Sequence, residues 1–242
     1  MTLLLGAVIV FCAAFLGGVT GFGYSLVATP VLLLLGLSLP FVVTVNLALA
    51  FLTRISVAYR LRADVWPARV GWLIAGSVPG LWLGAQVLMA VSQSTIKVAA
   101  GLVVMVAALL LARSLAAPAP ARSVPGAPVA AGFLGGFLGA SVSLNGVAPV
   151  LLLARDRAEP RAFLANLAVY FVASNAIGLM ILVAESALEP DALFPAFVLW
   201  LPGSLAGNWI GTTLGPRLPD VAFRRLTLAI VFIAGGVTAI TA

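Results

Sequence analysis

Small polar side chains gather at two glycine-rich stretches of an otherwise apolar chain, residues 17–23 and 132–146. Hydroxyl and amide groups donate hydrogen bonds, and a glycine backbone that leaves helical geometry exposes further N–H groups. Together with the positive ends of the helices that follow, such donors suit a small oxyanion. The substrate-binding residues predicted at these stretches are Gly21, Gly23, Ser25, Ser141, Ser143 and Asn145.

Two asparagines occupy matching positions in the apolar segments that come next. The tripeptide Asn-Leu-Ala starts at Asn46 and again at Asn166, and the amide of an asparagine offers two donors to an anion. We predict that both side chains flank the same site. The alternative is that Ser, Thr and Asn here join helices through interhelical hydrogen bonds, while the glycines allow close packing.

Arg54 lies about two turns inside the predicted end of its membrane segment, where the other half of the chain has Ser174. A charge at this depth is costly by a few kcal/mol on insertion scales (roughly 2.5–3.5), so such residues are candidates for a functional site. Either Arg54 supplies positive charge to the substrate or a gate, or its long side chain extends to the membrane surface.

Missing residue types narrow the chemistry further. The chain has no histidine and one cysteine, and its seven Asp and Glu fall in predicted loops or helix ends, with Glu185 nearest to the membrane. We therefore expect that the protein is not an enzyme and that it holds no cofactor and no metal centre. We also expect that it uses no carboxylate proton relay and carries no cationic substrate. Sodium bound by carbonyl and hydroxyl oxygens remains an open alternative for the coupling ion.

Composition defines the elements that must position these residues. Hydrophobic residues make up 63% of the chain, charged residues only 8%, and the mean hydropathy is +1.20. Apolar stretches of about 20 residues predict spanning helices, so the fold class is an all-α polytopic membrane protein with the lipid bilayer as its partner. The net charge of +6 is spread over several loops, which argues against a nucleic-acid partner.

The chain is predicted to contain two copies of one unit. The pattern Gly-Ser-x-x-Gly-x-Trp-x-Gly runs from Gly76 to Gly84 and again from Gly203 to Gly211, and the other matched pairs follow in the same order. We expect a first transmembrane repeat at 1–115, a Pro-rich cytoplasmic linker at 116–127 and a second repeat at 128–242.

Each repeat reads as one glycine-interrupted segment followed by three uninterrupted ones. The predicted segments are 3–37, 40–61, 67–91, 96–115, 128–154, 161–185, 191–215 and 220–242. The interrupted segments are too long for one crossing of a ~30 Å core, so each is either a hairpin or a broken crossing. Arginine placement favours hairpins that are re-entrant or fully spanning, because all basic loops except that of Lys97 then share the cytoplasmic side.

That arrangement makes the second repeat inverted relative to the first and places both termini on the non-cytoplasmic side. In total it gives about eight transmembrane helical elements. Inverted repeats with interrupted helices are typical of secondary transporters, whose central site opens alternately to either side.

The glycine-rich motif Gly17–Gly23 leads to Pro30, and the second half repeats it from Gly135-Gly136 to Pro149. In these motifs, and over nearly its whole length, the chain resembles the TauE/SafE family of sulfite exporters. The resemblance implies a bacterial inner-membrane protein that moves sulfite, sulfoacetate or a related organosulfonate.

We therefore predict a secondary transporter that carries a small anion by alternating access between the two repeats. An anion channel, or a membrane scaffold or assembly subunit with no transported ligand, is the alternative. The substrate is the expected small-molecule partner, and a homo-oligomer is compatible with the sequence.

Overall fold

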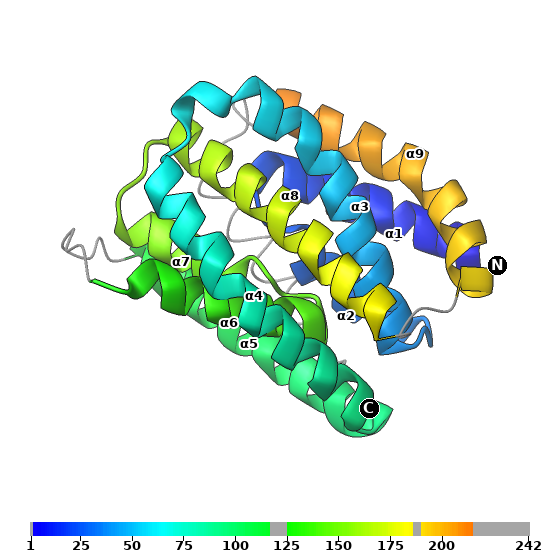
Figure 1. Cartoon of the computed structure of the whole chain (residues 1–242). Helices are drawn as coiled ribbons and strands as arrows, with labels where there is room; N and C mark the ends of the chain where they lie inside the picture. The colour runs from blue at the N-terminus through cyan, green and yellow to red at the C-terminus, as the bar shows by residue number, and fades with distance from the viewer. Residues whose placement is uncertain (1, 117–124, 186–189, 215–242) are drawn as a thin grey trace.

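The computed structural model describes residues 2–116, 125–185 and 190–214, and these are helical apart from short connections (Figure 1). The helices are α1 (Thr2–Thr20), α2 (Tyr24–Leu34), α3 (Leu39–Arg60), the 3-10 turn η1 (Arg62–Asp64), α4 (Pro67–Ala90), α5 (Gln93–Ala116), α6 (Ala127–Val142), α7 (Val147–Arg155), α8 (Pro160–Ala184) and α9 (Pro190–Leu214). Within the described ranges, five of them are long and apolar enough to cross a membrane: α1, α3, α4, α8 and the Leu193–Leu214 part of α9. The predicted all-α membrane fold is confirmed.

The predicted segments agree with these helices to within a few residues, and proline explains several of the starts. Pro67 and Pro160 open α4 and α8, where the missing N–H of proline has no helical partner to lose. At α3, the hydroxyl of Ser38 accepts a hydrogen bond from the N–H of Phe41 at 3.4 Å. The predicted segment 220–242 and most of the predicted linker lie outside the described residues.

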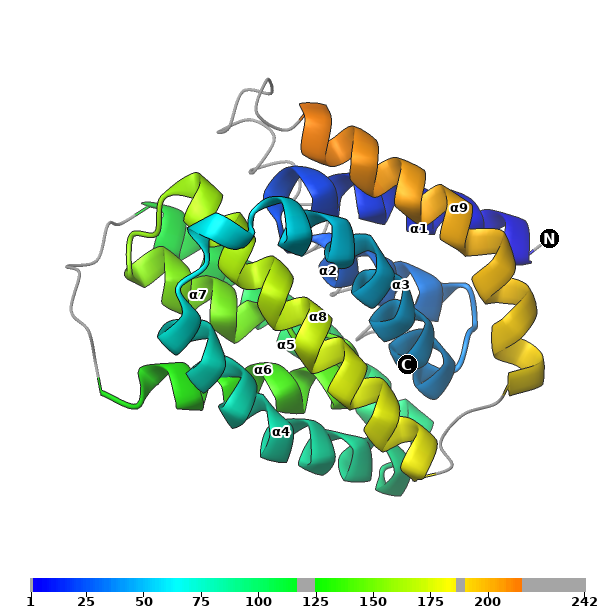
Figure 2. The same cartoon turned by 45° about the horizontal axis from the view of Figure 1, so that its top comes forward.

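Helices α4 and α6 run parallel with their backbones in contact (Figure 2). A Cβ atom added at Gly76 would lie 2.2 Å from the carbonyl oxygen of Val129, and one added at Gly84 would lie 2.4 Å from that of Phe137. Residue numbers rise together along both helices, so the two begin at the same end of the bundle. Only glycine allows so close an approach.

Helix α7 then returns to the end at which α6 began. Arg69, in the first turn of α4, forms an ion pair with Asp156, which directly follows α7. Arg161 and Asp64 form a second ion pair at this end, with 3.3 Å between Nη2 and Oδ2. The segment α6–α7 is therefore a hairpin and not a broken crossing.

The other interrupted segment forms a hairpin that opens at the opposite end. α1 runs parallel to α9. A Cβ added at Gly207 would lie 2.4 Å from the carbonyl oxygen of Phe11, and one added at Gly211 would lie 2.2 Å from that of Phe15, so residue numbers rise together along both helices. α9 begins where α8 ends, on the side away from the ion pairs. α2 comes back to that side, since a loop of four residues joins it to α3.

The halves exchange their first helices. α1 packs on α9 and α6 packs on α4, while α3 and α8 contact each other between these pairs (Figures 1 and 2). The repeated Gly-Ser-x-x-Gly-x-Trp-x-Gly pattern lies on α4 and α9, so its glycines form the surfaces that receive α6 and α1. Descent of both halves from one inverted unit stays a prediction.

The breaks are narrower than the glycine-rich stretches suggest. Gly17 and Gly18 lie within α1, and Gly132 and Gly136 lie within α6. These glycines are helical, and their role is to allow close contacts between helices. A Cβ added at Gly132, for example, would lie 2.0 Å from the carbonyl oxygen of Leu73. Only residues 21–23 and 143–146 interrupt the helices.

Candidate functional site

The first break is a tight turn between α1 and α2. Gly21 has a φ angle of +85°, which is accessible to glycine at no steric cost, and its N–H donates to the carbonyl oxygen of Gly17 at 2.8 Å. The hydroxyl of Thr20 accepts the N–H of Gly23 at 3.0 Å. The turn therefore satisfies its own backbone and leads directly into the amino end of α2.

The second break reverses the chain between α6 and α7 with a serine in the left-handed region. Ser143 has a φ angle of +65°, and its N–H donates to the oxygen of Gly139 at 3.0 Å. The N–H of Leu144 reaches the oxygen of Leu138 at 2.9 Å, which closes the carboxyl end of α6 as a Schellman motif does. Val147 then starts α7.

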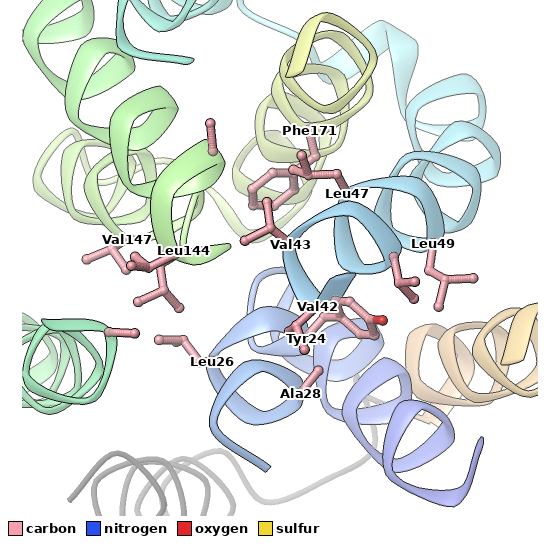
Figure 3. Packing of buried hydrophobic residues seen from close by; sticks show 14 of the residues in the cluster. Tyr24, Leu26, Ala28, Val42, Val43, Leu47, Leu49, Leu144, Val147 and Phe171 are labelled. Carbon is pink, nitrogen blue, oxygen red and sulfur yellow. The ribbon is translucent and has the colours of Figure 1, made fainter. Parts of the chain in front are cut away.

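A small pocket lies between the two breaks. It is lined by Phe22, Ser25, Leu26, Leu144, Gly146 and Val147 and contains about 180 Å³ of empty space, part of it open to solvent. Figure 3 shows Leu26 of α2 next to Leu144 of the second break and Val147 of α7. The amino ends of α2 and α7 both border this space, and no side chain caps either of them. Unpaired N–H groups at helix amino ends attract anions.

Asn46 joins the first half to the second break. Its Nδ2 donates to the hydroxyl of Thr29 in α2 and to the hydroxyl of Ser143, each at 3.1 Å. Its buried Oδ1 has no hydrogen-bond partner among the described residues. On the second half, the amide of Asn145 donates to the side-chain oxygen of Asn175. The second break is thus held by two buried amides, and one of them, Asn46, also binds α2.

Arg54 is buried, with 4% of its surface exposed. Its Nη2 donates to the carbonyl oxygen of Gly17 at 2.8 Å, and its guanidinium carbon lies 5.8 Å from the ring centre of Phe171 in α8. The side chain points into the bundle and does not extend to the membrane surface. It lies against the last turn of α1, where the helix dipole is negative and favours a cation.

The sequence profile described as sulfite exporter TauE/SafE matches residues 6–238. The chain belongs to this family. TauE/SafE proteins form a transporter family, so the chain is a multi-pass membrane protein of the anion-exporter type. No curated protein and no solved structure matched it.

In this TauE/SafE chain, Ser141 and Asn166 do not line the pocket. The hydroxyl of Ser141 donates to the oxygen of Phe137 in its own helix at 2.6 Å. The Oδ1 of Asn166 accepts the N–H of Trp66 at 2.8 Å, which ties α8 to the start of α4. Asn166 and Asn46 are therefore not brought together: Asn46 bonds to Ser143 of the second break, whereas Asn166 bonds to Trp66 at the start of α4.

Of the predicted substrate-binding residues, Ser25 lines the pocket directly, and Gly21, Gly23, Ser143 and Asn145 form the breaks that border it. Sequence reasoning missed the apolar lining residues and Asn175. Leu26 and Val147 carry no signal in an apolar segment, whereas Asn175 was visible as a polar residue inside one. The described residues contain no group of three His, Cys, Asp or Glu that could hold a metal ion.

Proposed function

We propose that the protein is a secondary carrier for a small oxyanion, sulfite or an organosulfonate such as sulfoacetate, in the bacterial inner membrane. The observation that carries the proposal is the meeting of two uncapped helix amino ends, from different halves, at one pocket. Their N–H groups and dipoles favour an anion at that point. Sulfite as the substrate class comes from the TauE/SafE family.

The form of the pocket supports a ligand of this kind. Apart from Ser25 and the glycine backbone, its walls are apolar, and an apolar wall excludes water and strengthens hydrogen bonds to a bound anion. The enclosed cavity measures about 10 Å³, which is about the room that one water molecule needs. The two breaks therefore have to move apart before even a compact oxyanion binds between them.

Alternating access is supported by the opposite directions of the two hairpins. α1–α2 opens at one end of the bundle and α6–α7 at the other, and their breaks meet at the pocket. Rocking the α1–α2 hairpin and its partner α9 against the α6–α7 hairpin and its partner α4 then exposes the pocket to one side at a time. The glycine contacts between α4 and α6 and between α1 and α9 hold each hairpin to its partner helix.

Counterflow in liposomes tests the proposal. Purified protein is reconstituted with unlabelled sulfite inside, and uptake of labelled sulfite, sulfoacetate, taurine or sulfate is followed. A carrier gives uptake that saturates and is stimulated by anion on the opposite side. Flux without this stimulation would indicate a channel, and the absence of flux for every anion would indicate a scaffold.

A matched pair of variants connects that flux to the pocket. Ser25→Leu fills the space between the breaks, and we expect counterflow to be lost. Thr213→Leu adds the same side chain at an exposed position near the end of α9, and we expect normal counterflow. Equal counterflow in both variants would remove the pocket from the transport route.

A further inference from the structure

Arg54 is an unusual residue for the interior of a membrane bundle. Neither of the ion pairs described above, Arg69–Asp156 and Arg161–Asp64, includes Arg54. A buried cation without a carboxylate is costly, and such residues in membrane proteins mark functional sites. The carbonyl of Gly17 and the carboxyl end of α1 offset part of this cost, because they present partial negative charge to the guanidinium.

One aromatic ring contacts both Arg54 and the pocket. The ring of Phe171 has the guanidinium carbon of Arg54 5.8 Å from its centre. At its tip, Cζ of Phe171 would lie 3.0 Å from a Cβ added at Gly146, and Gly146 also approaches Phe22. Gly146 and Phe22 both line the pocket. Figure 3 shows Phe171 extending from α8 toward Val43 and Leu47 of α3.

We propose that Arg54 is the charge-selecting residue of the transport site and that Phe171 holds it away from the pocket in the conformation described here. The inference rests on the proposed function, because it assigns a role at the proposed anion site to Arg54, the one buried side-chain cation among the described residues. When the Phe171 ring turns aside, the guanidinium exchanges the Gly17 carbonyl for oxygens of the anion. A guanidinium is suited to this exchange, because its planar donors match the oxygens of a sulfonate in pairs.

Selectivity follows from this arrangement. While the ring lies between them, the guanidinium cannot hydrogen-bond to an anion in the pocket and acts on it only over a longer distance. Once the ring moves, a unit positive charge faces a small space with apolar walls, where fields are weakly screened. An anion is then retained and a cation is repelled. Phe171 acts as a positioning residue, because it works through Arg54.

Cysteine labelling measures the charge at the pocket without requiring transport. Cys12, the single cysteine, is replaced by Ser, and Ser25→Cys places a thiol in the pocket. The measured quantity is the ratio of labelling rates with two methanethiosulfonate reagents, one carrying a sulfonate and the other a trimethylammonium group. We expect Phe171→Ala to raise the ratio in favour of the sulfonate reagent on the order of tenfold. Adding Arg54→Gln to that variant should return the ratio to its original value.

Control variants separate this effect from general loosening of the core. Phe41→Ala removes another buried aromatic side chain of the bundle, one that packs on Trp200 with ring centres 5.9 Å apart, and it should leave the ratio unchanged. Phe171→Leu replaces Phe171→Ala if the latter does not elute as a folded protein in size-exclusion chromatography. The inference is overturned if the ratio is the same with and without the Phe171 ring, or if Arg54→Gln does not change it.

The outcomes also distinguish this inference from the proposed function. A change in ratio that depends on Arg54, in a protein without counterflow, would support the position of the charge and contradict the carrier. Normal counterflow with no change in ratio would support the carrier and contradict the role of Arg54 and Phe171.

Discussion

At the first break, Arg54 of α3 donates to the Gly17 carbonyl in the last turn of α1. At the second, the groups that reach the break are neutral: Asn46 bonds to Ser143, and Asn175 accepts from Asn145. Ser174, the sequence counterpart of Arg54, is buried and carries no charge. The two breaks thus differ in charge: a buried arginine contacts the helix before the first, and neutral amides contact the second.

The comparison shows that two hairpins of similar backbone can differ in the polar groups around their breaks. The glycine contacts that hold the hairpins are close to the same at two of the three matched positions. An added Cβ would lie 2.1 and 2.4 Å from a carbonyl oxygen at Gly80 and Gly207, and 2.4 and 2.2 Å at Gly84 and Gly211, because helix packing imposes similar distances on each pair. The polar groups around the breaks carry no such constraint. A second buried arginine would repel the first and require its own compensation.

The largest expected effect tests whether the charge difference is functional. Replacing Arg54 with Ala removes the hydrogen bond that we propose the guanidinium makes to the anion, and a hydrogen bond to a charged group is worth about 1.5–3 kcal/mol. We therefore expect the half-saturating sulfite concentration in counterflow to rise roughly ten- to hundredfold. Ser174→Ala, at the matching position, should change it less than about twofold. Equal effects of the two variants would mean that the breaks do not differ in the way described.

The second prediction concerns matching positions of the repeated glycine pattern. An added Cβ at Gly76 would lie 2.2 Å from the Val129 oxygen, but one at Gly203 would lie 3.7 Å from that of Ala7. Gly76→Ala should therefore lower the free energy of unfolding by about 1–3 kcal/mol. Gly203→Ala should be neutral or stabilise by up to about 1 kcal/mol, because alanine is the better helix former.

Thermal unfolding of the detergent-purified variants checks this pair. Gly71→Ala is the control within α4, since nothing lies within 4 Å of an added Cβ there. A stable Gly76→Ala variant would show that α4 and α6 separate more easily than their contact suggests.

The third prediction separates the two asparagines. Asn46→Ala and Asn166→Ala each remove two side-chain hydrogen bonds, so each should lower stability by about 1–2 kcal/mol. Only Asn46→Ala should also alter the half-saturating anion concentration, because only Asn46 reaches a break. Altered transport in Asn166→Ala, with unchanged substrate-free stability, would restore the predicted pairing of the asparagines at one site.

The smallest expected effect concerns the local closure of the first break. Thr20→Val removes the hydroxyl that accepts the N–H groups of Gly23 and Phe22, at a cost of about 0.5–1 kcal/mol. The second break has no equivalent threonine, so Ser143 depends on Asn46 of the other half. A melting temperature for Thr20→Val equal to that of the unchanged protein would indicate that water replaces the hydroxyl.

The fold could largely be predicted from the sequence, because apolar runs and prolines mark helices within a few residues. The bounds of α4 agree with the predicted segment 67–91 almost residue for residue. The exact breaks could not be predicted, since a glycine that unwinds a helix and one that lets another helix approach are the same letter. Gly21 does the first and Gly132 the second, and only the neighbouring helix decides which.

The candidate site was predicted in part. Ser25 and Ser143 stood out because polar residues contrast with an apolar segment. Leu26 and Leu144 offered no such contrast, although they line the pocket. The bond from Trp66 to Asn166 spans a hundred positions of the chain, and no local pattern indicates it.

During synthesis, α1 is made long before the helix that receives it, α9, which starts at Pro190. At ~5–20 residues per second, roughly 10 to 40 seconds pass before the ribosome has made that partner. Through this interval the glycine face of α1 meets lipid or an insertion factor. Neither half is expected to fold by itself. A chain cut between α5 and α6 should therefore regain transport only when both fragments are produced in the same cell.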